Sequence, residues 1–115
     1  MRGHFMFTTE AMKSQFEILI SFRTPNGFKA CGQYFLGDDP VFAETVFAGL
    51  TGCEDVDGKA ILHLDLLEMS DGVPEMIRTI SCRLNELCGN LKHITCALFR
   101  EHAITIEEKR PAATR

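Results

Sequence analysis

Residues 14 to 23 carry an unbroken alternation in which Phe16, Ile18, Ile20 and Phe22 occupy every second position. Successive side chains of a β-strand point to opposite faces of a sheet, so this period indicates a strand with one buried face. The chain is therefore expected to fold around a sheet that is covered on one side and open on the other. Polar residues on the open side are where a function is expected.

The composition sets the size and the class of the protein. The chain has 115 residues, 45% of them hydrophobic and 24% charged, which suits one globular domain with its own core. It has no run of about 18 apolar residues that could cross a membrane, and its first residues lack the apolar stretch of a signal peptide. We expect a cytoplasmic protein with one domain at 14–108, a flexible segment at 1–13 and a flexible basic tail at 109–115.

Charge and cysteine content narrow the partners. The net charge of −4 argues against a nucleic-acid partner, because neutralising phosphates requires a basic face. The cysteines are odd in number and form no CxxC pair, which favours reduced thiols in a chain large enough to fold without disulfides. They are Cys31, Cys53, Cys82, Cys88 and Cys96.

Turn and cap signals divide the first half of the chain. The sequence Thr-Pro-Asn-Gly at 24–27 predicts a hairpin turn into a returning strand at 28–36, where Gly32 indicates a bulge or a close approach. Phe28 and Ala30 are assigned to the buried face of that strand. Asp39 and Pro40 predict the start of a helix that runs to about residue 50. A third strand is expected at 59–68.

The second half is predicted as a helix followed by one or two strands. Residues 70–90 carry an apolar stripe at helical spacing, which leaves Cys82 on the polar side. Alternation predicts a fourth strand at 92–99, and residues 103–108 suggest a fifth. The expected fold is an α/β (α+β) two-layer sandwich of order ββαβαβ(β). Its mixed sheet of four to five strands has both helices on one face.

This arrangement predicts the composition of the open face. Alternation places the following residues there: Glu17, Leu19, Ser21, Arg23, Lys29, Cys31, Gln33, Phe35, Ile61, His63, Asp65, Leu67, His93, Thr95, Ala97 and Phe99. His63 and Asp65 lie side by side on one strand, and Cys31 and His93 flank them in some strand orders. The face combines polar groups with large apolar ones.

Two catalytic interpretations follow from the polar members of this face. In the first, His63 lowers the pKa of the Cys31 thiol and Asp65 orients the imidazole. In the second, the same three residues and His93 supply ligands to Zn²⁺. Neither set has the local spacing of a known motif, and an ordinary half-solvated sheet surface explains the same residues. A thiol-dependent or metal-assisted enzyme acting on small molecules therefore stays an alternative.

The apolar members predict a partner surface. Leu19, Phe35, Ile61, Leu67 and Phe99, with His93 beside them, form a patch that two copies of the chain would cover by packing face to face. A concave face also suits a small apolar ligand. We expect a non-enzymatic binding or oligomerisation module, most simply a homodimer, that uses no cofactor and no resident metal.

Cys82 is a candidate reactive thiol that lies outside the open face. On the predicted helix it lies one turn after Arg78, whose charge favours a thiolate, so a reactive thiol is conceivable there. Cys88 and Cys96 fall on apolar stripes and are expected in the core. No motif in the chain indicates a family.

Overall fold

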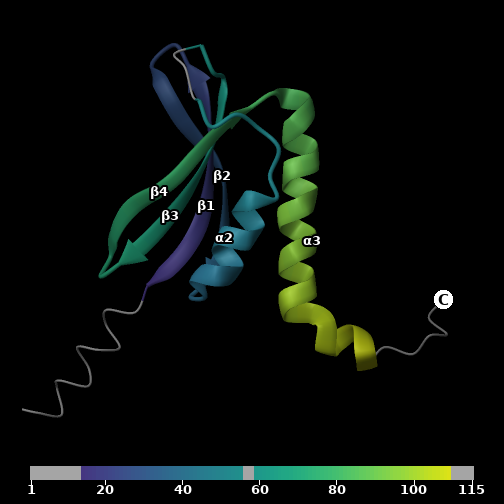
Figure 1. Cartoon of the computed structure of the whole chain (residues 1–115). Helices are drawn as coiled ribbons and strands as arrows, with labels where there is room; N and C mark the ends of the chain where they lie inside the picture. The colour runs from purple at the N-terminus through teal and green to yellow at the C-terminus, as the bar shows by residue number, and fades with distance from the viewer. Residues whose placement is uncertain (1–13, 56–58, 110–115) are drawn as a thin grey trace, which may run out of the picture.

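The computed structural model describes residues 14–55 and 59–109, with only the backbone of 103–109. Its elements follow the order ββαββα (Figure 1). The flexible segment predicted at 1–13 lies outside the described residues, as does the tail predicted at 109–115 apart from Lys109, whose backbone ends the last helix. In the part of the chain that the structure describes, no helix combines the length and hydropathy needed to cross a membrane.

The first hairpin forms as its turn residues predict. Strand β1 (Gln15–Thr24) pairs with β2 (Gly27–Gly37), and Pro25 and Asn26 make the two-residue loop between them. The Thr24 hydroxyl donates to the Gly27 carbonyl at 2.6 Å and accepts from the Asn26 amide at 3.2 Å. Gly27 has φ of +111°, a value that side-chain-bearing residues rarely adopt. Local chemistry therefore fixes this turn.

The helix after the hairpin also begins where its cap predicts. Helix α2 (Pro40–Ala48) has Asp39 as its N-cap, whose carboxylate accepts from the Val41 amide at 3.0 Å. Proline at the first helical position loses no hydrogen bond, because that amide has no partner inside a helix. Ala43, Val46 and Phe47 form the buried side of α2.

The second hairpin completes an open sheet of four strands. Strand β3 (Leu62–Ser70) pairs with both β1 and β4 (Val73–Cys82), which gives the strand order β2-β1-β3-β4. All three pairings are antiparallel, where a mixed sheet was expected. Strands β2 and β3 run in the same direction, as their helical connection predicts, but β1 lies between them.

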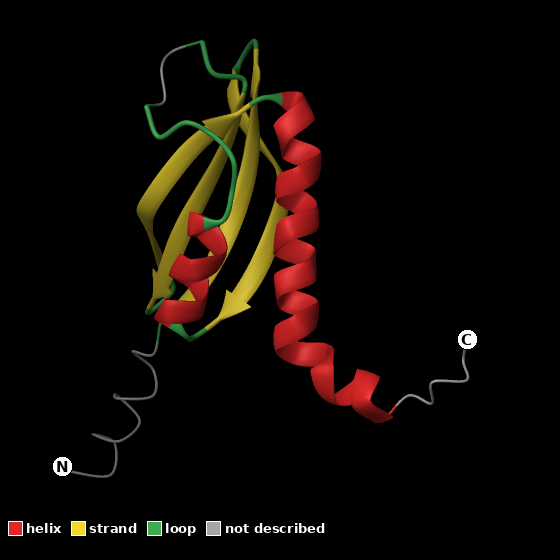
Figure 2. Ribbon diagram, turned by 45° about the vertical axis from the view of Figure 1, so that its right-hand side comes forward, coloured by secondary structure: helices red, strands yellow, loops and turns green. Residues whose placement is uncertain are grey.

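One face of this sheet carries the core. Ile18 and Ile20 of β1 lie opposite Leu66 and Leu64 of β3, and all four side chains are buried. Buried residues of α2 and of the last helix, α3 (Leu84–Lys109), join the same cluster. Figure 2 shows α2 in front of the sheet and α3 beside it. The fold is thus α+β, with helices packed on the face that carries Ile18 and Leu64.

Polar contacts hold α3 to the rest of the molecule. The side-chain amide of buried Asn90 accepts from the Thr51 amide at 2.7 Å and donates to the Thr51 carbonyl at 2.8 Å. His93 Nε2 lies 3.2 Å from the Val46 carbonyl of α2. Asn90 thereby satisfies the backbone groups of Thr51 beyond the end of α2, and His93 contacts the last turn of that helix.

The helix predicted at 70–90 is wrong up to Cys82 and correct from Leu84 on, and the predicted strands at 92–99 and 103–108 are wrong. Asp71 and Gly72 have φ of +60° and +78° and form a two-residue hairpin loop, which aligns 73–82 as strand β4. Asp-Gly favours this loop, because both central residues must adopt positive φ. Residues 84–109 are helical instead, and Ile94 and Ala97, three residues apart, face the core.

We expect Leu64→Ala to lower the free energy of unfolding by about 2 to 5 kcal/mol, because Leu64 is fully buried on a central strand. Leu84→Ala is the matched control: that leucine is 72% exposed, and its loss should change stability by less than about 0.5 kcal/mol. Urea denaturation measures both values. Equal losses in the two variants would contradict the assigned core.

Candidate functional site

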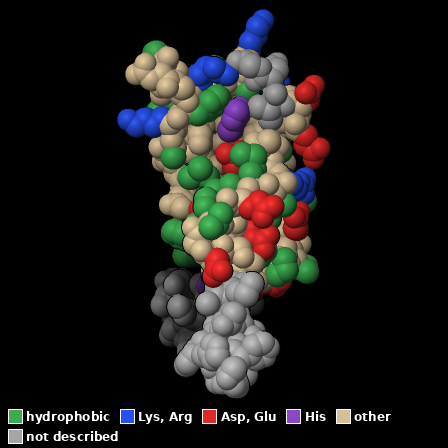
Figure 3. All heavy atoms as spheres, turned by 90° about the vertical axis from the view of Figure 1, so that its left-hand side faces the viewer, with side chains coloured by type: hydrophobic (Ala, Val, Ile, Leu, Met, Phe, Trp, Pro, Cys, Tyr) green, Lys and Arg blue, Asp and Glu red, His purple; other side chains and the backbone are tan. Residues whose placement is uncertain are grey.

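The open face of the sheet is formed by the alternate residues of β1 and β3. The register pairs Glu17 with Leu67, Leu19 with Asp65, and Ser21 with His63. Paired residues of antiparallel strands share a face, so these side chains lie opposite the core. Figure 3, viewed from the side away from α3, shows hydrophobic side chains interspersed with acidic ones.

Two carboxylates on this face are buried and already hydrogen-bonded. Glu17 is 6% exposed and accepts from Gln33 Nε2 at 2.9 Å, and Asp65 is 8% exposed and accepts from the Thr79 hydroxyl. A buried charge without such a partner would be costly. Because neighbours on β2 and β4 supply these donors, both carboxylates hold the surface of the sheet together across strands.

His63 lies in an aromatic stack. Its ring lies parallel to the Phe28 ring with centroids 4.1 Å apart, and the Arg23 guanidinium lies 4.8 Å from the Phe28 centroid. Strand β1 lies between the strands that carry the two rings, so the stack crosses β1 next to Ser21, whose side chain is buried. His63 Nε2 is buried and has no hydrogen-bond partner among the described residues.

A β-bulge in β2 changes the predicted face of its first residues. Ile20 is opposite Gly32 and Ser21 is opposite Ala30, which leaves Cys31 as the extra residue. Phe28 and Ala30 therefore lie on the open face, and their predicted place in the core is wrong. Gly32 carried the available signal: a Cβ there would lie 3.2 Å from Ile20 Cδ1, so both a bulge and a close approach are present.

The proposed catalytic residues are only partly brought together. His63 and Asp65 share a face of β3, as predicted, but Asp65 is engaged by Thr79 and the His63 ring by Phe28. Exposed Cys31 lines a hollow that also contains the core residues Leu62 and Cys82. Within the described chain, no three His, Cys, Asp or Glu side chains converge to hold a metal ion.

The residues of the predicted apolar surface lie in three separate places. Leu19, Phe35 and Leu67 stay together on the open face, around Glu17. His93 and Phe99 belong to α3, where His93 contacts α2 and the Phe99 side chain is exposed. Ile61 is exposed just before β3, at the end of the sheet nearest the first hairpin. The candidate contact surface is therefore Leu19, Phe35 and Leu67.

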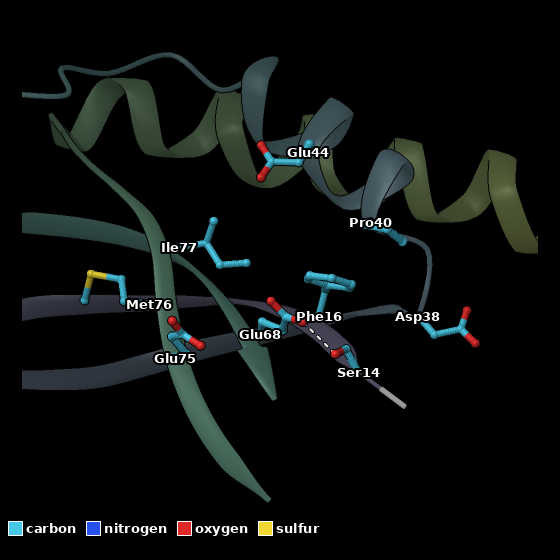
Figure 4. A pocket seen from close by; sticks show the side chains of 9 residues that line it. All are labelled: Ser14, Phe16, Asp38, Pro40, Glu44, Glu68, Glu75, Met76 and Ile77. Carbon is cyan, nitrogen blue, oxygen red and sulfur yellow. Dashed lines mark hydrogen bonds between the residues drawn. The ribbon is translucent and has the colours of Figure 1, made fainter. Parts of the chain in front are cut away.

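A hollow at the opposite end of the sheet is acidic (Figure 4). Its volume is about 610 Å³, and Asp38, Glu44, Glu68 and Glu75 line it. Glu68 and Glu75 lie opposite each other on β3 and β4, an arrangement of like charges that is unfavourable without compensation. The Ser14 hydroxyl donates to Glu68 at 2.6 Å, and Arg78 pairs with Glu44 at 3.1 Å. These contacts give Glu68 and Glu44 structural partners.

The prediction that Cys82 is an exposed thiol beside Arg78 is wrong. Cys82 is buried at the end of β4, and burial raises its pKa, with a smaller raising effect from Glu86 opposed by a hydrogen bond from Asn90. Arg78, four residues away on the strand, pairs with Glu44 and Glu54. Cys88 and Cys96 are exposed on α3 instead of buried. All three differences follow from the changed secondary structure of this half.

Cys82 should therefore react with iodoacetamide far more slowly than the exposed Cys31, Cys53, Cys88 and Cys96. Its raised pKa also predicts a stability contribution that is present below the ordinary thiol pKa and is lost as pH rises above it. Timed labelling with peptide mass spectrometry, and urea denaturation across alkaline pH, measure the two effects. Cys82→Ala should reduce the alkaline loss of stability. Early labelling of Cys82 in the folded protein would contradict its burial.

Comparison of the chain with protein-family models, with curated proteins and with solved structures finds no match in any of the three. The functional argument therefore starts from the geometry of the open face.

Proposed function

We propose that the protein is a non-enzymatic binding module that self-associates through the open face of its sheet. The observation that supports this most directly is the group of Leu19, Phe35 and Leu67 around the buried carboxylate of Glu17. Phe35 lies on the edge strand β2 and is 70% exposed. An exposed aromatic side chain among apolar neighbours is characteristic of protein contact surfaces.

The polar groups of this face favour its burial. Glu17 and Asp65 already accept hydrogen bonds from Gln33 and Thr79 inside one molecule. A second copy therefore removes water mainly from apolar side chains, and leaves those two carboxylates with partners they already have. Desolvating unpaired carboxylates would oppose association far more strongly.

The edges of the sheet are less suited to continuation by another copy. The bulge at Cys31 interrupts β2, and a second irregularity between Leu66 and Leu67 interrupts the pairing of β3 with β4. Pro74 removes one amide from the outer strand β4. Bulges and prolines on edge strands discourage edge-to-edge pairing. Face-to-face packing is the arrangement that this sheet favours.

Charge is distributed in a way that suits two copies with reversed strands. Arg23 lies on the open face near the first hairpin, and Glu17 on the same face and Asp71 in the β3–β4 loop lie toward the other end of the sheet. In Figure 3 most basic side chains lie at the upper end, and acidic ones extend from there down to the lower part. A two-fold axis perpendicular to the strands would bring the basic end of one copy over the acidic end of the other.

Phe35→Asp is expected to weaken the dimer at least about tenfold, because it places a charge at the centre of the apolar contact. Phe99→Asp is the matched control, since Phe99 is 64% exposed but belongs to α3. Light scattering coupled to gel filtration at tens of micromolar reports the mass. Wild type and Phe99→Asp should give twice the chain mass of 12.9 kDa.

A monomer mass for the wild-type chain under these conditions would overturn the proposal. So would equal weakening by the two substitutions, because that result would place the contact elsewhere or show a general loss of structure. Far-ultraviolet circular dichroism of both variants distinguishes a general loss of structure from a contact that lies elsewhere.

A further inference from the structure

A second hollow, distinct from the open face, lies where α3 begins. Its volume is about 920 Å³, within the range of about 300 to 1,000 Å³ typical of small-molecule sites. Phe22 and Leu62 come from the sheet, Ile61 from the loop before β3, and Leu84 from the first turn of α3. Ile61 and Leu84 are 63% and 72% exposed, so large apolar side chains border the hollow without being covered.

The same hollow is lined by three of the five cysteines. Cys31 comes from the bulge of β2, Cys53 from the segment after α2, and Cys82 from the end of β4. They do not form a metal-binding group within the described chain. Thiols are weak hydrogen-bonding groups that behave as small apolar side chains, so they add to the apolar character of the walls.

The described lining of this hollow contains as many basic residues as acidic ones. Lys59 and Arg83 are basic, and Asp55 and Glu86 are acidic. Glu86 also accepts from the Arg83 amide at 2.8 Å, which places a negative charge at the positive N-terminus of α3. The described lining residues therefore carry no net charge that would select an ion, which suits an uncharged molecule.

The outer edge of β4 is not free to pair with an extended peptide at this place. The Cys53 amide donates to the Ser81 carbonyl at 2.8 Å, and the Ser81 amide donates to the Cys53 carbonyl at 2.9 Å. These two bonds occupy the outer edge of β4 beside the hollow, so a peptide cannot pair with the backbone there. A compact ligand fits the observations better than a chain segment.

We propose that this hollow is a binding site for an uncharged, predominantly apolar small molecule. Contact with Phe22, Ile61 and Leu84 supplies the binding energy through removal of apolar surface from water. The charged residues stay at the rim. The site lies apart from Leu19, Phe35 and Leu67, so it does not depend on self-association.

The uncharged fluorophore Nile red is the probe for the test, titrated into the purified full chain. Leu84→Asp should weaken its binding at least about tenfold, because the substitution places a charge in the apolar wall. An acidic residue in the first turn is compatible with the helix. Val41→Asp is the matched control, because Val41 is also 72% exposed but lies on α2 outside the hollow. Its affinity should stay at the wild-type value.

Cysteine labelling locates the bound probe independently. Saturating Nile red should slow the alkylation of Cys31 and Cys53 several-fold, and leave Cys88 and Cys96 unchanged, because only the first two of these exposed thiols line the hollow. Absence of saturable binding, equal effects of Leu84→Asp and Val41→Asp, or unprotected Cys31 and Cys53 would each overturn the proposal. Phe35→Asp should retain the probe; loss of binding there would place the probe on the open face.

Discussion

The pairing of β1 with β3 is the constraint on which the rest of the structure depends. It aligns Ile18 with Leu66 and Ile20 with Leu64, four side chains from which water is almost completely removed. Two adjacent strands with such a row cannot remain stable in water unless another layer covers them. Helices α2 and α3 supply that layer, and no described helix or strand covers the opposite face.

The open face shows how a central strand accommodates carboxylates. Glu17 and Asp65 lie on β1 and β3, where neighbouring strands cover them, yet each accepts a hydrogen bond from a side chain on an adjacent strand. These bonds fix polar groups that would otherwise oppose dehydration of the face. Leu19, Phe35 and Leu67 are then the groups whose burial is still incomplete, which is why association is proposed to centre on them.

The sequence allowed prediction of the elements that depend on nearby residues. The alternation of β1, the Pro25–Asn26 turn and the Asp39 cap each act within a few residues, and all three occur as predicted. The wrong predictions concern residues whose sequence is compatible with both a helix and a strand. Residues 77–88 fit a helical stripe, but the Asp71–Gly72 loop commits the chain to a hairpin and places Arg78, Ile80 and Cys82 toward the core side. That Asp-Gly signal is present in the sequence, and the hairpin that it favours prevails over the helical stripe.

The candidate site was less predictable because its contacts join distant residues. Asn90 was expected to end a helix, but it lies inside α3 and binds Thr51, 39 positions away. The Phe28–His63 stack depends on the bulge at Cys31, which reverses the face of the residues before it. A single-residue shift of this kind moves a whole strand segment to the other side of the sheet. The alternation of side chains correctly predicts the two faces of β1 and β3. It assigns the residues of β2 before the bulge to the wrong face.

The hollow beside α3 forms because a strand extends further per residue than a helix does. Strand β2 has 11 residues, and α2 has 9. At about 3.3 Å and 1.5 Å per residue, the strand extends roughly 36 Å and the helix roughly 14 Å, so α2 covers less than half the length of β2. The part of the sheet toward the first hairpin receives only the first turn of α3 and the segment around Cys53. Because α2 is shorter than β2, apolar side chains in this part of the sheet are not covered by a second layer. This difference in length leaves Ile61 and Leu84 exposed, and it also creates the space that a small apolar ligand would fill.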